Sequence, residues 1–465
     1  MPEFPHSDPP DRDPPARWLT YTLLVAAFLT GGGTRSPGMD DAVVQLFALL
    51  VAVIAVAQLL RSPPDPLRKS GIGVACLLLA LPLLQLMPLS PDSWQATPAR
   101  AALAADLQAV GATVDARWTL APHATWRAWA SLLPAFAAFL AVLAFARSKA
   151  TQRALLRLLV GLSIASILLG FVQLGVPQDS LLNPFPERPP VLNGVFSNPN
   201  HQGIAAVAAL AIALAMFLQE LRGDRAARRA WRLGGWAFAA AFLLLALPLM
   251  GSRGAVLIAV FVVALVPVAM GAFSRRRLRS GWTARMGLVA AAGLAAVGLS
   301  AAMGWMQVDA VDELRAPLRD ATATLAAAHA PLGTGMGAFV PAFEQAAPDR
   351  LLMDEYINHA HNEYLQWWAE LGWLAWLAGA AVALLLAFAA ARVARNWPHV
   401  SREIAVASLV VPLALMGHGF VDFPLRTPAL MTVAAITIGI FLNVAGSHTR
   451  AHARSVHSRD MPTPA

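Results

Sequence analysis

Charged residues are scarce in this chain. Asp, Glu, Lys and Arg together make up 13% of its 465 residues, whereas hydrophobic types make up 57%. Ordinary soluble proteins contain about 25% charged and about 45–50% apolar residues. The mean hydropathy of +0.56 deviates in the same direction. The composition therefore excludes a soluble multi-domain enzyme and a disordered chain, and it indicates an all-α, polytopic membrane protein.

Cysteine is almost absent. The single cysteine, Cys76, lies within an apolar run. One cysteine can form neither an internal disulfide nor a cysteine-based metal cluster, which excludes a disulfide scaffold. The start of the chain also lacks the basic residues and short apolar core of a signal peptide. Residues 1–17 instead hold six prolines and three aspartates, and we expect them to form a proline-rich cytoplasmic segment.

Long apolar runs, in contrast, are plentiful. A membrane-spanning helix needs about 20 predominantly apolar residues, and by this measure the sequence predicts twelve spans. The first run is short and the eleventh is interrupted by Pro412. The predicted spans are residues 18–33, 42–60, 71–89, 128–146, 155–175, 203–221, 233–250, 255–273, 286–305, 367–391, 403–419 and 429–446.

Positive charge alternates along these spans. A net charge of +8 would suggest nucleic acid if the chain were soluble, but in membrane proteins Lys and Arg concentrate in the cytoplasmic loops. If the N-terminus is cytoplasmic, the inner segments carry 25 of the 35 Lys and Arg residues and the outer segments carry ten. This split predicts twelve spans with both termini in the cytoplasm, and no nucleic-acid partner.

The predicted spans form one membrane domain, residues 18–446, followed by a cytoplasmic tail, residues 447–465. Two outer loops are long. The first covers residues 90–127, and the second covers residues 306–366 between the ninth and tenth spans. Within the second loop, we expect residues 311–330 to form a helix outside the bilayer or at its surface. No soluble domain of independent size fits between the spans.

Unusual polar residues gather at the outer ends of the spans. The segment R-P-P-V-L-N-G-V-F-S-N-P-N-H runs from Arg188 to His201, just before the sixth span. Asn198 and Asn200 in this segment are candidates for substrate binding or for helix caps.

The segment G-S-R-G, residues 251–254, places Arg253 at the outer tip of a tight helical hairpin. An arginine near a membrane is costly and is usually paired or functional, although its side chain can also snorkel to the interface. The planar guanidinium suits bidentate contacts with phosphate oxygens. Arg253 and Arg188 are therefore candidate ligands for the diphosphate of a lipid.

The segment H-A-H-N-E-Y-L-Q-W-W-A-E-L-G begins at His359 and ends at Gly372. If a helix begins near Asn362, Gly372 lies about three turns along it, on the face of His361, where it allows a neighbouring helix to pack closely. A neutral histidine is suited to act as a general base, whereas H-x-H alone is a weak metal pattern. We expect His361 to be the base, with capping or an interfacial contact as the alternative.

The segment H-G-F-V-D-F-P-L-R-T-P, residues 418–428, lies between the last two spans. Its acid, Asp422, has three roles open to it: positioning a donor group, pairing with Arg426, or stiffening the turn. The glycine-rich segment P-L-G-T-G-M-G-A-F, residues 331–339, is expected to be a mobile loop, although such a loop can also hold phosphate through backbone amides.

These segments, in this order and at these ends of the spans, resemble the O-antigen ligase and polymerase family of bacterial envelope proteins. The ligases of that family carry a His followed by Asn, Ser or Gln, nine residues, a Gly, three residues, and a Gly, Thr or Tyr. His361, Asn362 and Gly372 match this pattern, but Trp376 occupies the last position. That departure leaves room for a polymerase. The resemblance covers most of the chain from about residue 70 to about residue 440.

The resemblance implies a metal-independent, inverting glycosyltransferase that needs no cofactor and acts at the periplasmic face of the bacterial inner membrane. The expected partners are an undecaprenyl-diphosphate-linked glycan as donor, lipid A–core or another glycan as acceptor, and membrane lipids. His361 and Arg253 are the expected catalytic residues, with His361 acting on the acceptor hydroxyl. The expected substrate-binding residues are Arg188, Asn200, Asn362 and Asp422.

A membrane transporter is the alternative from another class, because members of this superfamily have been called bicarbonate transporters. A transporter is expected to carry polar groups and broken helices at mid-membrane. Here the centres of the spans are Ala, Leu and Val, and the polar segments lie at one face. This arrangement favours a one-sided enzyme.

Overall fold

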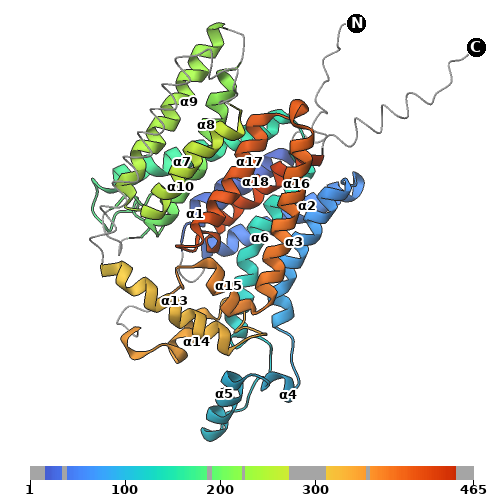
Figure 1. Cartoon of the computed structure of the whole chain (residues 1–465), viewed down its shortest axis with the longest axis vertical. Coiled ribbons are helices and arrows are strands. Elements are labelled where there is room, and N and C mark those ends of the chain that lie inside the picture. Colours follow the sequence, from blue (N-terminus) through green and yellow to red (C-terminus); the bar gives the residue numbers. More distant parts are fainter. Residues whose placement is uncertain are drawn as a thin grey trace, which may run out of the picture.

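The computed structural model describes residues 16–33, 39–185, 191–222, 226–271, 310–351 and 357–446, and these residues are mainly helical (Figure 1). A single bridge between Pro88 and Arg117 is the only β-type pairing in the described ranges. This all-helical architecture confirms the fold class that the composition predicts.

Eight of the described helices are long and apolar enough to cross a membrane. Two further apolar helices, α1 (Ala16–Thr30) and α10 (Arg253–Ala269), are shorter, and α17 (Arg402–His418) lies beside α8 and α18. The chain is therefore a multi-pass membrane protein. The eight long helices are α2 (Met39–Arg61), α3 (Pro66–Gln85), α6 (Pro122–Phe145), α7 (Lys149–Gln173), α8 (Pro199–Glu220), α9 (Ala226–Ala246) continued by η1 (Leu247–Met250), α16 (Leu374–Arg395) and α18 (Pro428–Gly446).

Every predicted span except one overlaps a helix of the structure. The exception, residues 286–305, lies outside the described residues, as do the N-terminal segment 1–15 and the tail 447–465. The count of twelve spans therefore stays a prediction.

The predicted tenth span, residues 367–391, is wrong at its start. A short helix, α15 (Glu363–Leu371), ends at Gly372, and α16 begins at Leu374. Gly372 has φ +59° and ψ −137°, a backbone conformation that favours glycine. A Cβ atom at this position would lie 1.9 Å from the carbonyl oxygen of Pro331. Gly372 thus terminates a helix where the 331–339 segment packs against it, and it does not share a continuous helix face with His361.

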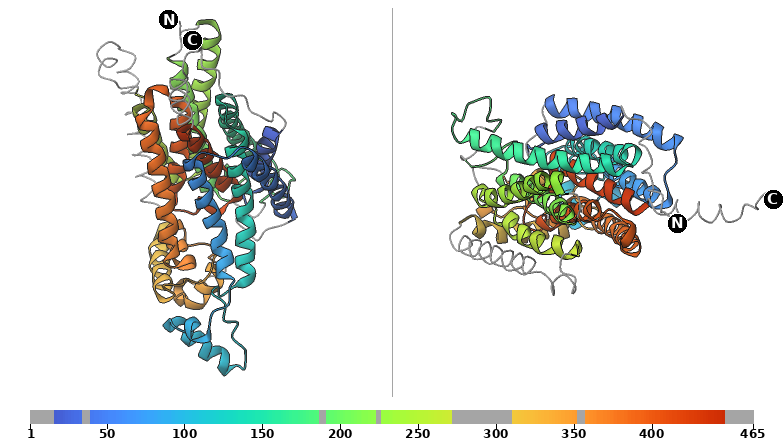
Figure 2. Two further views of the ribbon diagram at one scale, coloured as in Figure 1. Left: turned by 90° about the vertical axis from the view of Figure 1, so that its right-hand side faces the viewer. Right: turned by 90° about the horizontal axis from the view of Figure 1, so that it is seen from above.

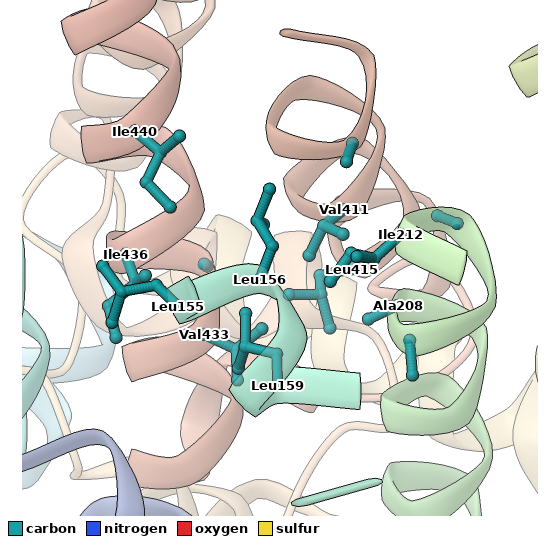
Figure 3. Close-up of a cluster of buried hydrophobic side chains, with 14 of the residues drawn as sticks. Leu155, Leu156, Leu159, Ala208, Ile212, Val411, Leu415, Val433, Ile436 and Ile440 are labelled. Carbon is teal, nitrogen blue, oxygen red and sulfur yellow. The ribbon is translucent and has the colours of Figure 1, made fainter. Parts of the chain in front are cut away.

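The centre of the bundle is formed by α8 and α18, in which most residues are buried. Small residues make this close packing feasible: a Cβ added to Gly439 of α18 would lie 2.9 Å from Val142 of α6. Figure 3 shows aliphatic side chains from α7, α8, α17 and α18 meeting in this core. They include Leu155, Leu156, Leu159, Ala208, Ile212, Val411, Leu415, Val433, Ile436 and Ile440.

The two long outer loops lie at one end of the bundle (Figures 1 and 2). One contributes α4 (Pro91–Trp94) and α5 (Pro98–Ala109), and the other contributes α13 (Ala310–Ala328), α14 (Phe339–Ala346) and η2 (Asp349–Leu351). The helix expected at 311–330 is confirmed by α13. On the opposite side of the bundle, α16 and α17 are joined by a short connection containing η3 (Trp397–His399).

Candidate active site

The candidate site forms where the start of α15 meets the turn between α17 and α18. Asn362 is the N-cap of α15: its side-chain oxygen accepts from the backbone N–H of Leu365. Its side-chain amide donates to the carbonyl oxygen of Phe420 in the facing turn. The side chain of Asn362, which we expected to bind substrate, thus caps its own helix with the oxygen and ties that helix to the facing turn with the amide.

His361 immediately precedes this cap and has φ +48°, the only positive φ of a non-glycine residue in the described chain. This left-handed conformation is uncommon for a residue with a side chain. Strained backbone of this kind persists where the surrounding contacts impose it, and it is frequent at functional sites. The His361 side chain remains about one-third exposed, at 34%, so its ring can be reached from outside.

Asp422 lies against His361 on the buried side. The Nδ1 atom of His361 is 3.5 Å from Oδ1 of Asp422, and Nε2 of His201 at the start of α8 is 3.9 Å from the same oxygen. Asp422 is 1% exposed, and its Oδ2 atom accepts no hydrogen bond from the described residues. One buried carboxylate therefore stands between two imidazoles.

Phe423, the next residue, packs against three histidine rings. Its ring centroid lies 4.1 Å from that of His359, 5.0 Å from that of His361 and 4.9 Å from that of His201. His359 instead contacts the side-chain amide of Gln366. Among the described residues, no group of three His, Cys, Asp or Glu side chains is placed to hold a metal ion.

Arg426 does not pair with Asp422, which corrects one of the three roles considered for that acid. Its Nε donates to Oε1 of Glu363 at 3.1 Å and its Nη1 donates to Oε2 of Glu370 at 2.8 Å. Both glutamates are 1% exposed and the Arg426 side chain is 11% exposed. Two carboxylates of α15 thus face one guanidinium of η4 (Pro424–Arg426).

The burial of these groups changes their protonation. Desolvation raises the pKa of Glu363 to about 7, although the Arg426 charge opposes this rise. Desolvation, with the nearby charges of Arg426 and His361, lowers the pKa of His359 well below its ordinary value and keeps that ring neutral. Burial alone would raise the pKa of Asp422, but its interactions with His361, His201 and His418 outweigh burial and lower it. Asp422 is therefore a carboxylate.

Arg253 is the first residue of α10, after the N-cap Ser252 and after Gly251 at φ +69°. The next residue, Gly254, packs against the Asp422 turn. A Cβ added to Gly254 would lie 2.8 Å from the His418 ring and 2.9 Å from the side chain of Val421. The tight hairpin expected around Arg253 therefore lies beside the turn that carries Asp422.

Part of the segment that precedes the sixth predicted span, residues 188–201, lies at the site. Asn198 is the N-cap of α8, with its side chain accepting from the backbone N–H of Asn200. Asn200 is partly buried and precedes His201, which faces Asp422. Arg188 lies outside the described residues.

The 331–339 segment is packed and is not a free loop. Gly333, Gly335 and Gly337 all have positive φ. Thr334 and Gly335 donate backbone hydrogen bonds to Ala369 and Glu370 at the end of α15. The segment therefore supports the break at Gly372 and offers no open cradle of backbone amides.

Sequence reasoning missed several residues of this site. Glu363, Gln366 and Glu370 recur at helical spacing in an otherwise apolar stretch, and that periodicity was a usable signal for a polar helix face. His201 and His418 belonged to recognised segments, but their approach to Asp422 depends on how distant helices pack. Arg315 of α13, whose positive charge acts on the His418 ring, was also missed, because its approach to that ring depends on the packing of distant helices.

Comparison with known families gives one match. A family model described as O-antigen ligase matches residues 238–378, which include Arg253, His361 and Gly372. This match confirms the resemblance drawn from the sequence. No curated protein matches the chain.

Proposed function

We propose that this chain, a member of the O-antigen ligase family by its residues 238–378, transfers an undecaprenyl-diphosphate-linked glycan to a sugar hydroxyl of lipid A–core. The observation that supports the proposal most is the pairing of an accessible His361, which lies within the matched residues 238–378, with the buried carboxylate of Asp422. A histidine oriented by a carboxylate is an arrangement typical of a general base.

The proposed reaction begins at His361. Its free ring nitrogen takes the proton of the acceptor hydroxyl, and the acceptor oxygen forms a bond to the anomeric carbon of the donor sugar. The bond between that carbon and the diphosphate oxygen breaks, and the electron pair leaves with the diphosphate. Attack opposite the leaving group inverts the anomeric configuration. Asp422 orients the ring through Nδ1 and stabilises the imidazolium that forms.

Arg253 is proposed to bind the diphosphate and to stabilise its charge as the bond breaks. Its position supports this role, because Gly254 contacts His418 and Val421 on the turn that carries Asp422. We propose Arg188 and Asn200 as further donor contacts. No step of this chemistry requires a metal or a cofactor, and we propose that the reaction is metal-independent.

The proposed site faces the periplasm from the inner membrane, with both termini in the cytoplasm. The segments that form it belong to the end of the bundle where α4, α5, α13 and α14 lie (Figure 2). The break at Gly372 lies at this same end and not at mid-span, which is unlike the mid-membrane broken helices of a transporter.

A deletion strain tests the proposal directly. Loss of long glycan from lipid A–core, with lipid-linked polymer accumulating, supports a ligase. Accumulation of single unpolymerised repeats would instead identify a polymerase of the same family, for which the Trp376 departure leaves room. An unchanged glycan profile together with loss of solute uptake would overturn the proposal in favour of a transporter.

A further inference from the structure

We infer that Glu363, with Arg426 and Glu370, is a positioning residue that holds Asp422 against His361. The inference rests on the proposed function, because it assigns a role toward that reaction to residues that do not touch substrate. It starts from a buried polar face of α15. Glu363, Gln366 and Glu370 lie at helical spacing on this face, and each is 1% exposed.

Glu363 holds the Asp422 turn on both sides. Its backbone N–H donates to the carbonyl oxygen of Gly419 at 2.8 Å, before Asp422 in the chain. Its carboxylate accepts from the backbone N–H of Leu425 at 3.1 Å and from Arg426 at 3.1 Å, after Asp422. One residue thus fixes the two ends of a short turn whose centre carries the proposed partner of His361.

The other polar residues of α15 complete the arrangement. Gln366 accepts from the backbone N–H of Ala360, next to His361, and its amide donates to Glu370. Glu370 in turn accepts from Arg426. The His361 loop and the Asp422 turn are therefore tied to the same helix face, which fixes their separation.

The charges in this network explain why the arrangement should be sensitive to substitution of Glu363. Arg426 is buried between two carboxylates, and the geometry of this network depends on both acceptors. A glutamine at position 363 keeps the size of the side chain but turns an N–H toward one of the two donors, Leu425 or Arg426. A displacement of about 1 Å at a reacting group can cost about 10²-fold in rate.

The test measures transfer by the purified protein in proteoliposomes at pH 8, above the pKa of about 7 of Glu363. The donor is glycan-loaded undecaprenyl diphosphate extracted from the deletion strain, and the acceptor is lipid A–core from the same strain. Glu363→Gln should lower kcat by about tenfold or more and leave the donor KM within about twofold. Glu344→Gln, an exposed glutamate of α14, is the matched control and should retain kcat.

A double-mutant cycle separates positioning from general destabilisation. If Glu363 acts through Asp422, Glu363→Gln should cause no further loss in the Asp422→Asn background. Arg426→Lys, which keeps the charge with a single donor nitrogen, should lie between the parent and Glu363→Gln. Equal losses of kcat in both backgrounds would overturn the inference. So would a loss of kcat/KM that arises from a raised donor KM with kcat unchanged.

A measurement without turnover keeps the inference testable if the proposed function fails. The rate of carbethoxylation of His361 is followed by mass spectrometry on folded, monodisperse protein. Asp422→Asn should change this rate, Glu363→Gln should change it in the same direction, and the double variant should add nothing. An unchanged rate in Glu363→Gln would overturn the positioning role. An inactive parent with the expected labelling pattern would reject only the proposed reaction.

Discussion

His361 and Asp422 are in contact across two distant segments, with Nδ1 of the imidazole 3.5 Å from Oδ1 of the carboxylate. His361 belongs to the loop before α15, and Asp422 belongs to the turn between α17 and α18. The carboxylate is buried while the imidazole is partly exposed. The acid therefore contacts the ring from the protein side, while about one-third of the His361 side chain stays exposed.

His361→Ala should lower turnover by about 10²–10⁴-fold, the usual contribution of a positioned proton acceptor. Binding of the donor should change far less, because the diphosphate is assigned to Arg253. His359→Ala should do less harm, since that ring is partly buried against Phe423 and neutral. His123→Ala, at an exposed position of α6, is the control. Turnover and donor binding are measured on each purified variant, and a greater loss in His359→Ala would contradict the assignment.

Arg253→Lys should lose most transfer activity while the protein still inserts in the membrane. Lysine keeps the positive charge but lacks the planar fork that makes bidentate contacts with phosphate oxygens. The measurement compares transfer per amount of inserted protein between parent and variant. If transfer per inserted protein is unchanged, the arginine serves only to reach the interface, and the diphosphate assignment is abandoned.

Gly372→Ala should lower the apparent Tm and the yield of folded protein. The backbone at this position has φ +59°, and a Cβ atom would lie 1.9 Å from the Pro331 carbonyl oxygen. Such strain costs on the order of 1–3 kcal/mol before the clash is counted. Gly379→Ala in α16, where a Cβ meets no atom within 4 Å, is the matched control and should be neutral or slightly stabilising. Equal effects in the two variants would contradict the break at Gly372.

The contribution of Glu363 to the stability of the parent protein should fall as pH rises from about 5 to about 8. The pKa of Glu363 is raised to about 7 from 4.5, so its protonated form favours the folded state. That contribution is complete below pH 4.5 and is lost as pH rises through 7, by on the order of 3 kcal/mol. Arg426 and Glu370 face this carboxyl. Apparent Tm is measured across this range in both proteins, and the Tm of Glu363→Gln relative to the parent should increase as pH rises. A constant difference between the two proteins would refute the prediction.

Reporter fusions after Leu221 and after Ala346 should report opposite sides of the membrane. The first position follows α8 at the predicted cytoplasmic end, and the second ends α14 in the predicted periplasmic loop. Alkaline phosphatase should be active only after Ala346, and a cytoplasmic reporter only after Leu221. The same side for both would mean that the predicted span count is wrong.

The sequence by itself determined the helical membrane architecture and the segments that form the site. A helix that spans a membrane requires a long apolar run, so these helices could be located without knowledge of how they pack. Arg253, His361 and Asp422 were singled out as candidates because polar residues are conspicuous at the ends of such runs. The helix break at Gly372 was missed, because a glycine in an apolar run also suits close packing within a span.

Only the tertiary structure decided which polar groups meet. In the sequence, Asp422 and Arg426 lie four residues apart and suggest a local pair, yet Arg426 pairs with Glu363 and Glu370. The packing of α8, α15 and α17 around the Asp422 turn places His201 and His361 beside that acid. The spacing of residues along the chain contains no information on these contacts, because they depend on the separation and orientation of helices that are distant in sequence. Burial then sets the protonation of the groups, since the same carboxyl has a different pKa in water and inside the bundle.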